Sequence, residues 1–507
     1  MQAIPSDDQI GVGTMFQYLG TAVQVVSATL FYLILVRYNT QEIFGAISLL
    51  VALIGLFNII LTFGLNVTAQ HFVSYYLASD DQLSARNVSI KLLFLSFMIS
   101  IIGLLAVSFF SVNISSIFFH TKNYSYIINL LTVPLFGNVI FGILNGILLG
   151  MQRFKISAFI SILTWISYYF LPIILTIINK SIELIILGWS IGIFEGLALE
   201  LIIVINFFKN NMAFKFILPT KIELKYTIPL FFSSLVGFGA VYVDRFIVAG
   251  LMNLAYLALY NFSLLFVSSL SFIAIPLNNI LLTKFSELLG DNDRNRLKHY
   301  VSISMKFLSF IYVPLALILA SLIKPLLLLL AGREYLTGTI PAQIIIISSA
   351  LFISLNVLVQ ALSSIRLTRV FIISSSSSLV GNLTISILLI PKIGIIGAAL
   401  GYSSVYALTF FILLYFVIKE DIYSFDYLAN LKIWVSGLLP FVLIIELEQI
   451  IGTETILIFP FFVISVSLYL IFIRVLKTFK SERDGMILKF FPARPRILIN
   501  LMKLLIN

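Results

Sequence analysis

The chain has 507 residues, of which 60% are hydrophobic and 11% are charged, and its formal net charge is +10. A charged share nearer about 25% is usual for soluble proteins, so this composition excludes a soluble chain with a water-facing surface. The absence of cysteine excludes a disulfide framework, a cysteine zinc site and a thiol nucleophile. The three histidines, His71, His120 and His299, are too far apart in sequence for a metal-binding motif, and no metal site is predicted.

Apolar runs of about 17 to 25 residues, long enough to cross the hydrocarbon core of a bilayer, recur along the whole sequence. They are continuous rather than alternating, which predicts helices and not a β-barrel. We therefore predict an all-α polytopic membrane protein of fourteen transmembrane helices, the thirteenth being the weakest because Glu446 and Glu448 interrupt it. In chain order, the predicted spans are 13–36, 43–66, 88–112, 126–149, 156–178, 182–206, 227–250, 257–282, 300–323, 340–363, 370–391, 394–418, 432–450 and 454–476.

The basic residues test this set of spans independently. Most of the 32 Lys and Arg residues fall in the loops on the same side as the amino terminus, which the positive-inside rule assigns to the cytoplasm. An even number of spans then places both termini in the cytoplasm, and we expect a multi-pass protein of the plasma membrane. The tail, 479–507, mixes basic and apolar residues and predicts an amphipathic helix bound to anionic membrane lipid.

Two stretches match at one constant offset. Leu187–Ser190 corresponds to Leu400–Ser403, and Arg153 corresponds to Arg366. This match predicts a duplication with six helices in each copy, and since six is even, the two copies have the same orientation in the membrane. The predicted domains are an N-lobe, a cytoplasmic basic linker, a C-lobe, two appended helices and the tail, at 1–208, 209–226, 227–418, 419–478 and 479–507.

The short loops leave no room for a water-exposed module. The sequence lacks a glycine-rich phosphate loop followed by Lys-Ser or Lys-Thr, so ATP hydrolysis by this chain is not expected. No cofactor, nucleic-acid partner or enzymatic activity is predicted. Transport would then draw on an ion gradient, the membrane potential or the gradient of the substrate itself.

Three segments carry a family resemblance. Asn382–Ala399 has the order asparagine, apolar run, Ile-Pro, basic residue and Ile-Gly-Ile-x-Gly-Ala-Ala, and Gly146–Lys155 has the order glycine, apolar residues and Gly-x-Gln-Arg-Phe-Lys. Val243–Gly250 adds an Asp-Arg-Phe sequence, and Leu259–Asn261 and Pro276 follow it. Over the first twelve predicted spans the chain thus resembles the polysaccharide flippases, whose superfamily also holds multidrug and toxic compound extrusion transporters and lipid II flippases.

The resemblance implies a cavity between two lobes and a lipid-linked oligosaccharide as substrate, turned from the cytoplasmic to the outer leaflet. Such a transporter must shelter a sugar and phosphate headgroup from hydrocarbon while the lipid tail stays outside. Glycan-assembly enzymes are the protein partners that this activity suggests. Since unpaired polar groups are costly at membrane depth, each ionisable residue there is a functional candidate.

Three ionisable residues of the membrane spans are such candidates. Arg245, near the outer end of the seventh span, is expected to attract a phosphate, and Asp244 to carry a proton or a sodium ion; otherwise Arg245 anchors to outer headgroups and Asp244 makes a structural hydrogen bond. Glu195, in the middle of the sixth span, is a second candidate for ion coupling and should face protein or be protonated, unless it only bonds a neighbouring helix. Glu200 is five residues further on, nearer the cytoplasmic boundary and on a different face, so it does not pair with Glu195.

The first two spans supply the remaining substrate-binding candidates. Arg37 ends the first span on the outer side, where it could hold the headgroup or serve as an interfacial anchor. Gln24 and Asn58 offer amide donors and acceptors that suit sugar hydroxyls, although hydrogen bonding between helices explains such amides equally well.

Two other functions stay open. A cation-coupled multidrug exporter belongs to the same superfamily, and Asp244 would then hold the cation. A membrane glycosyltransferase or polymerase is the other hypothesis. Such enzymes need carboxylates or a metal site, and the only acidic outer loop, from Glu446 to Glu454, is too short to supply them.

Overall fold

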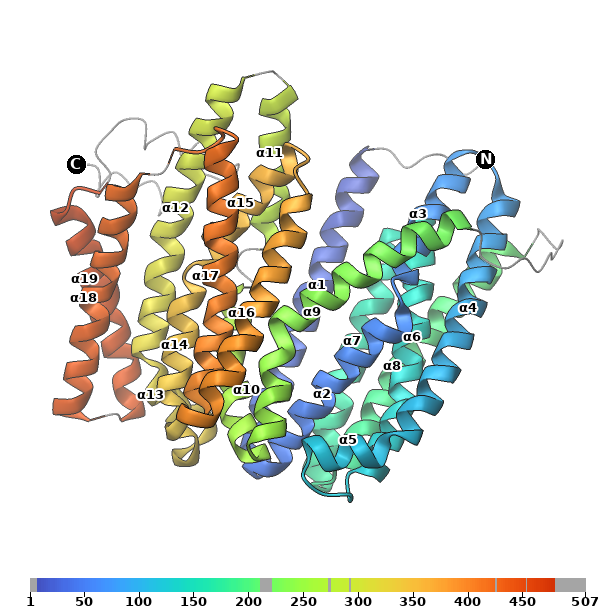
Figure 1. Cartoon of the computed structure of the whole chain (residues 1–507), viewed down its shortest axis with the longest axis horizontal. Helices are drawn as coiled ribbons and strands as arrows, with labels where there is room; N and C mark the ends of the chain where they lie inside the picture. Colours follow the sequence, from blue (N-terminus) through green and yellow to red (C-terminus); the bar gives the residue numbers. More distant parts are fainter. Residues whose placement is uncertain are drawn as a thin grey trace. The chain divides into compact units, whose positions relative to one another are not determined.

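The computed structural model describes residues 7–209, 221–271, 275–290, 293–424, 426–452 and 454–478. These residues form helices, with no β-strand among them, so the predicted all-α fold is confirmed (Figure 1). Most of the predicted linker, at 210–220, and the predicted amphipathic tail, 479–507, lie outside the described residues. In chain order, the helices are α1 (Asp7–Tyr38), α2 (Gln41–Thr62), α3 (Leu65–Ala78), α4 (Gln82–Phe109), α5 (Ser111–Phe118), α6 (Ser125–Gly150), α7 (Phe154–Ile178), α8 (Ile182–Phe208), α9 (Lys221–Leu251), α10 (Leu254–Ser271), α11 (Ile275–Gly290), α12 (Arg294–Ser321), α13 (Ile323–Ala331), η2 (Arg333–Gly338), α14 (Thr339–Ser349), α15 (Phe352–Ser364), α16 (Arg369–Ile393), α17 (Ile395–Lys419), α18 (Tyr427–Ile451), η3 (Thr455–Leu457) and α19 (Ile458–Val475).

Thirteen helical segments of the described chain are long and apolar enough to cross a membrane. They correspond to thirteen of the fourteen predicted spans. The remaining prediction, the span at 257–282, falls on α10 and α11. The apolar part of α10, Leu254–Leu270, is shorter than the other spans. The three residues before α11, 272–274, are not among the described residues.

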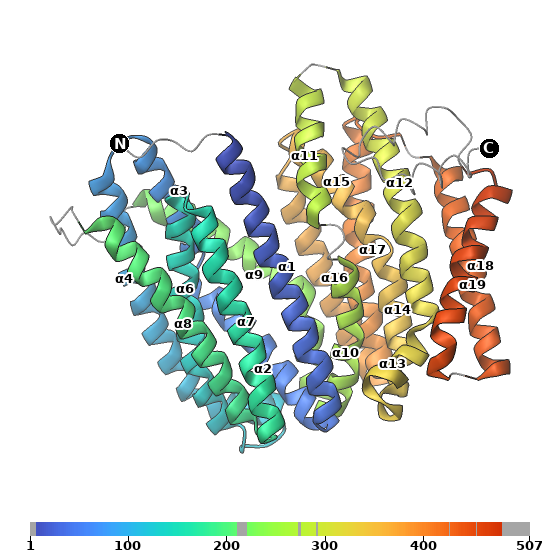
Figure 2. The same ribbon diagram turned by 180° about the vertical axis from the view of Figure 1, so that it is seen from behind.

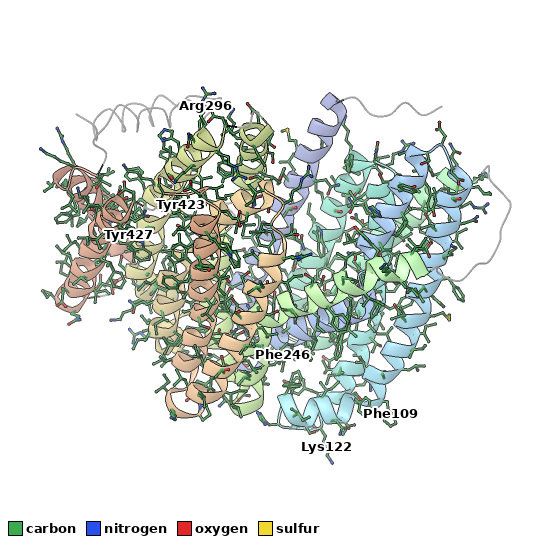
Figure 3. All side chains as sticks on the ribbon, turned by 45° about the horizontal axis from the view of Figure 1, so that its top comes forward. Phe109, Lys122, Phe246, Arg296, Tyr423 and Tyr427 are labelled. Carbon is green, nitrogen blue, oxygen red and sulfur yellow. The ribbon has the colours of Figure 1, made fainter. Side chains whose placement is uncertain are left out.

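The chain forms two compact units, Met1–Ala258 and Leu259–Asn507. In the first unit α6 is the most buried span, and it contacts α2, α3, α4 and α8, while α7 lies between α1 and α8 (Figure 2). Figure 3 shows Phe109 and Lys122 at the end of this unit that α5 forms. The boundaries predicted for the two lobes and the linker stay a prediction.

A left-handed turn separates α2 from α3. Phe63 and Gly64 have φ angles of 52° and 75°, a region that residues with a Cβ seldom occupy. The predicted second span, 43–66, therefore ends close to this turn, and α3 continues as a separate helix to Ala78. The turn gives α3 a direction of its own, and this matters for the two cavities described below.

In the second unit α12 is the most buried span, and it contacts α14, α15 and α18. The last predicted helix, α19, is attached through Tyr469 Oη, which donates a 2.7 Å hydrogen bond to the carbonyl oxygen of Phe310. Figure 3 shows Arg296, Tyr423 and Tyr427 at the end of this unit where α12 begins. The two appended helices thus pack on the bundle through α12.

The glycines of the two matched sequences occupy similar positions in the two units. A Cβ on Gly188 of α8 would lie 2.7 Å from the ring of Pro172 on α7. A Cβ on Gly401 of α17 would overlap the side chains of Ser386 and Asn382 on α16. Each glycine therefore permits close packing of consecutive helices, α7 with α8 and α16 with α17. Asn382, which belongs to the family motif, is buried at this contact, so the motif has a packing role here.

Candidate functional site

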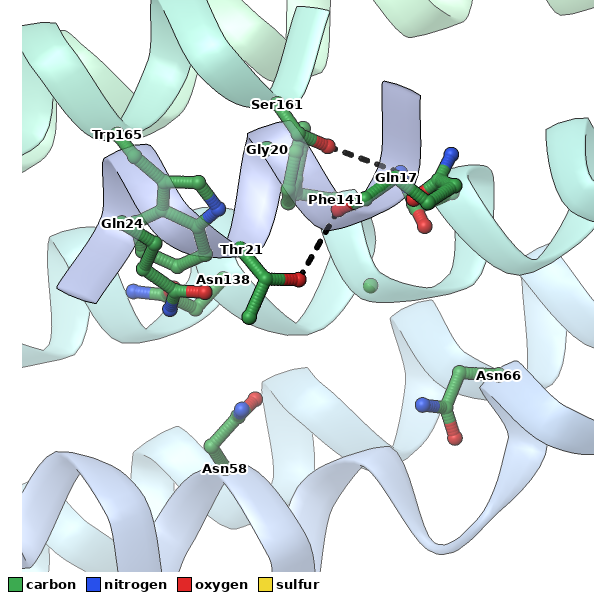
Figure 4. Close-up of a pocket in the computed structure, with 12 residues that line it drawn as sticks. Gln17, Gly20, Thr21, Gln24, Asn58, Asn66, Asn138, Phe141, Ser161 and Trp165 are labelled. Atoms are coloured by element: carbon green, nitrogen blue, oxygen red, sulfur yellow. Dashed lines mark hydrogen bonds between the residues drawn. The ribbon is translucent and has the colours of Figure 1, made fainter. Parts of the chain in front are cut away.

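A polar cavity of about 280 Å³ lies inside the first unit. Six side-chain amides line it together with the indole of Trp165, and the residues come from α1, α2, α3, α6 and α7. In Figure 4 the labelled amides of α1, α2, α3 and α6 surround the cavity. The amides are Gln17, Gln24, Asn58, Asn66, Asn138 and Asn145. We call this space the amide cavity.

Hydrogen bonds fix the wall of the amide cavity. Gln17 Nε2 donates to the carbonyl oxygen of Phe154 at 2.9 Å and to Ser157 Oγ at 3.1 Å, which joins α1 to α7. Asn145 Nδ2 donates to the same Ser157 oxygen at 3.0 Å from α6. Because these bonds connect three helices, the cavity keeps its shape without a ligand.

Behind this wall lies Glu200, a carboxylate that the sequence analysis does not count among the candidate site residues. Asn145 Nδ2 also donates to Glu200 Oε1 at 2.8 Å. Glu200 is completely buried, and its other oxygen, Oε2, has no hydrogen-bond partner among the described residues. A buried acceptor without a donor is costly, so this oxygen is available to a proton, a cation or a donor group.

Glu195, the predicted ion-coupling residue of the same helix, is exposed on the first unit. Residues five positions apart on a helix point about 140° away from each other, so only one of Glu195 and Glu200 can face the bundle. A signal for Glu200 does exist in the sequence. Glycines at every fourth position, Gly188, Gly192 and Gly196, mark the buried face of α8, and Glu200 continues that series.

The other predicted ion-coupling residue, Asp244, is completely buried on α9. Next to it, Arg245 is half-buried, and its guanidinium carbon lies 3.9 Å above the ring centroid of Tyr242. Arg245 Nη1 also donates to the carbonyl oxygen of Val241 at 3.0 Å. Tyr242 in turn stacks on Phe238 with the two rings nearly parallel, 4.3 Å between centroids. The charge is therefore held on an aromatic surface by a cation–π contact.

Aromatic rings link this arginine to the amide cavity. Trp165, in the cavity wall, stacks on Tyr169 with 6.1 Å between the ring centroids, and the ring centroids of Phe31 and Tyr169 are 5.6 Å apart. Phe31 also contacts Tyr32, at 5.3 Å, and Tyr32 is close enough to Arg245 for an electrostatic interaction. The polar cavity and the arginine are thus the two ends of one aromatic cluster.

The structure brings together some of the predicted substrate-binding residues. Gln24 and Asn58 both line the amide cavity, and Arg245 is connected to it through the aromatic cluster. Arg37 lies apart, exposed in the last turn of α1, where a positive charge also stabilises the helix end. Within the described part of the chain, no three His, Asp or Glu side chains are placed to hold a metal ion.

Comparison with known proteins identifies the family. The family model described as "Polysaccharide biosynthesis protein" matches residues 34–339. The chain belongs to this family. The matched segment includes the amide cavity residues Asn58 to Trp165, Glu200, and the Asp244–Arg245 pair. No curated protein sequence matches the chain significantly.

Solved structures confirm the fold. The inward closed conformation of the lipid II flippase MurJ matches with a TM-score of 0.71 and 15% identity, over 91% of this chain and 98% of that one. An inward-facing multidrug resistance MATE family transporter of the MOP superfamily matches with a TM-score of 0.61 and 13% identity, over 79% and 95%. A MOP superfamily transporter from Pyrococcus furiosus gives a TM-score of 0.54 at 14% identity, over 82% and 95%. The chain therefore has the fold of these transporters.

Proposed function

We propose that the protein is a flippase that moves a lipid-linked oligosaccharide from the cytoplasmic to the outer leaflet by alternating access. It would act in the plasma membrane with both termini in the cytoplasm, next to the enzymes that assemble the glycan. The observation that carries this proposal is the amide cavity, a neutral, hydrogen-bonding space inside a unit built from membrane-spanning helices.

The chemistry of the cavity suits a sugar. Six amides offer both donors and acceptors, and the indole of Trp165, which lines the cavity, can pack against the apolar face of a sugar ring. The walls carry no ionised side chain, so the cavity favours neutral hydroxyl groups over anions. Polar groups at membrane depth are tolerated where they bond other protein groups or line a cavity that holds water or a ligand.

A phosphate needs a different partner, and Arg245 supplies one. Its guanidinium is held by Tyr242 and by a backbone carbonyl at one end of the aromatic cluster. Arginine binds phosphate oxygens through paired hydrogen bonds. We propose that Arg245 holds the phosphate of the headgroup while a sugar occupies the amide cavity.

Energy would come from a proton or a sodium ion. Glu200 is the carboxylate best placed for this, because its free oxygen lies directly behind a cavity residue. Asp244 and the exposed Glu195 stay candidates from the sequence. Binding of a cation at Glu200 would alter the Asn145 hydrogen bonds and so couple the ion to the sugar.

Transport into liposomes tests the proposal. The purified protein is reconstituted with a fluorescent lipid-linked oligosaccharide, and the headgroup that becomes accessible to a membrane-impermeant quencher is measured. We expect flipping by the native protein and a decrease of about tenfold in Gln24→Leu and Asn58→Leu, the loss of about one hydrogen bond to the sugar. Asn356→Leu is the matched control, because Asn356 is a half-buried amide that bonds only its own helix, at Phe352. Equal rates in all variants would refute the proposal.

A second function has one observation in its favour. A buried carboxylate such as Glu200 also suits an organic cation, the substrate of a multidrug exporter. Under this alternative, tetraphenylphosphonium binds the reconstituted protein, and Glu200→Gln abolishes the binding. A cation that fails to bind, together with oligosaccharide flipping, excludes the exporter.

A further inference from the structure

A second cavity, of about 470 Å³, lies along α3 in the first unit. Six of its seven lining residues follow one face of α3, and Tyr226 at the beginning of α9 closes one side. The lining residues are Val67, Gln70, His71, Ser74, Tyr75, Ala78 and Tyr226. We call this open space the α3 groove. It shares no residue with the amide cavity, although Asn66 of that cavity lies only one turn before Gln70 on the same helix.

The groove combines aromatic rings with neutral polar groups. The imidazole of His71 stacks on the ring of Tyr226, with 4.6 Å between the ring centroids and an interplanar angle of 15°. Tyr75 is 60% exposed and therefore free to contact a ligand. Gln70 and Ser74 add an amide and a hydroxyl, and no Lys, Arg, Asp or Glu lines the groove. A phosphate would require a cation here, and an acyl chain would require an apolar lining, whereas a neutral sugar ring fits both the aromatic and the polar groups.

Contacts around α3 and α9 hold the walls of the α3 groove in place without a ligand. Thr68 on α3 and Thr227 on α9, the residue after Tyr226, share a buried hydrogen bond of 2.9 Å. Phe63 and Phe231 stack at 4.4 Å one turn further along. A buried ion pair between Lys91 of α4 and Glu223, at 3.4 Å, fixes the first turn of α9. Because both walls are held in place, little conformational entropy is lost when a ligand binds.

We propose that the α3 groove is a second sugar-binding site, for a neutral pyranose ring of the glycan headgroup, distinct from the amide cavity. Its physiological role rests on the proposed flippase function. In the predicted topology this end of α3 is cytoplasmic, so the groove receives the headgroup before transport. Asn66 and Gln70 lie one turn apart on α3, so the same helix presents one amide to the groove and one to the amide cavity.

Binding of simple sugars to the full-length protein in nanodiscs tests the site. Saturation-transfer difference NMR is recorded with methyl α-glucopyranoside, methyl β-galactopyranoside and N-acetylglucosamine, all in an Asn58→Leu background that weakens the amide cavity. We expect saturable binding of at least one sugar, weakened about tenfold by Tyr75→Ala or His71→Ala. Tyr75→Phe should retain binding because it keeps the ring.

Tyr256→Ala is the matched control, an exposed tyrosine outside the groove, and it should bind the sugar normally. The thermal midpoint of each variant shows that it is folded. Failure of all three sugars to bind, or equal binding in Tyr75→Ala and Tyr256→Ala, overturns the proposal. So does displacement of a bound sugar by inorganic phosphate, which would identify an anion site.

The flipping assay separates this inference from the proposed function. If both hold, Tyr75→Ala raises the substrate concentration for half-maximal flipping about tenfold and leaves the maximal rate unchanged, whereas Asn58→Leu lowers the maximal rate. Sugar binding in the groove without any flipping by the native protein would reject the flippase and retain the site. Normal flipping by Tyr75→Ala, with no sugar binding in the groove, would reject the groove as a sugar-binding site and retain the flippase.

Discussion

Asn145 Nδ2 donates a 2.8 Å hydrogen bond to Glu200 Oε1 and thereby joins α6 to α8 behind the amide cavity. The same nitrogen contacts Ser157, so its amide group has a fixed orientation, with Nδ2 toward the carboxylate. A carboxylate accepts hydrogen bonds and donates none while it is ionised. The hydrogen bond to Glu200 therefore helps to fix the orientation of the Asn145 amide in the wall of the amide cavity.

Removal of the Asn145 amide should destabilise the protein. Asn145→Leu leaves the buried Glu200 carboxylate without its donor, and we expect the free energy of unfolding to fall by about 1–3 kcal/mol. Thermal or denaturant unfolding in detergent measures this change. The control is Asn356→Leu, whose amide bonds only its own helix; a similar loss in both variants would mean that Glu200 does not depend on Asn145.

Glu200→Gln separates the hydrogen bond from the charge. Glutamine still accepts from Asn145 through its carbonyl oxygen, so the variant should fold with nearly native stability. It cannot bind or release a proton in the physiological range, and we expect flipping driven by an imposed ion gradient to fall at least tenfold while substrate binding persists. The measurement is headgroup translocation in liposomes with and without the gradient. Gradient-driven flipping that is unchanged in Glu200→Gln would exclude this residue from coupling.

The sequence predicted the helices well because their signal is local. An apolar run of membrane-spanning length contains its own evidence, and an amide within such a run, such as Gln24 or Asn58, is conspicuous. Both amides do line the cavity. The choice between Glu195 and Glu200 was harder, since it depends on the direction in which α8 faces its neighbours. A mid-span position favoured Glu195, but packing against α6 buries Glu200.

Features that depend on two helices could not be predicted at all. The stack of His71 on Tyr226 joins residues that are far apart in sequence, and so does the contact between Thr68 and Thr227. The eighth predicted span similarly reads as one apolar run, whereas the structure assigns its residues to α10 and α11. Composition specifies that a segment is apolar, and only its packing partners determine where it ends and which face it buries.

Close helix packing at Gly192 predicts a steric effect. A Cβ there would lie 2.6 Å from the Cα of Tyr168 on α7, and because backbone cannot rotate away, Gly192→Ala should destabilise the protein by about 1–3 kcal/mol. Gly237→Ala is the matched control on α9, where the new Cβ would meet no described atom within 4 Å beyond the nearby backbone of its own helix. There alanine removes the flexibility of glycine, and we expect up to about 1 kcal/mol of stabilisation. Unfolding midpoints with opposite shifts confirm the prediction, whereas a tolerated Gly192→Ala contradicts it.

The turn before α4 predicts a dependence on pH. Asp81 Oδ1 accepts from the backbone N–H of Ser84 at 2.9 Å, and hydrogen bonds from the side chain and backbone of Ser84 lower the pKa of this carboxyl. A lowered pKa means that the cap stabilises α4 fully above the unfolded value of about 3.9 and loses its effect as the pH falls through the folded value. We expect hydrogen exchange of the first α4 amides to accelerate below that pH. In Asp81→Asn, which caps without a charge, the acceleration should be absent; its persistence would place the titration elsewhere.

The ion pair between Lys91 and Glu223 differs from the pair between Lys298 and Asp421 in its burial. Lys91 and Glu223 are almost completely buried, with 9% and 3% of their side chains exposed, whereas Asp421 is 79% exposed. Lys91→Met leaves a buried carboxylate without its cation and should cost about 3–5 kcal/mol. Lys298→Met should cost no more than about 1 kcal/mol because water screens the exposed pair.

In the double variant Lys91→Met with Glu223→Gln, much of the stability should return, since both charges are then gone. Unfolding of the three variants measures these differences, and equal losses for Lys91→Met and Lys298→Met would show that burial does not strengthen the pair. Because Glu223 also fixes the first turn of α9, Lys91→Met is expected to weaken sugar binding in the α3 groove, whereas Lys298→Met is not.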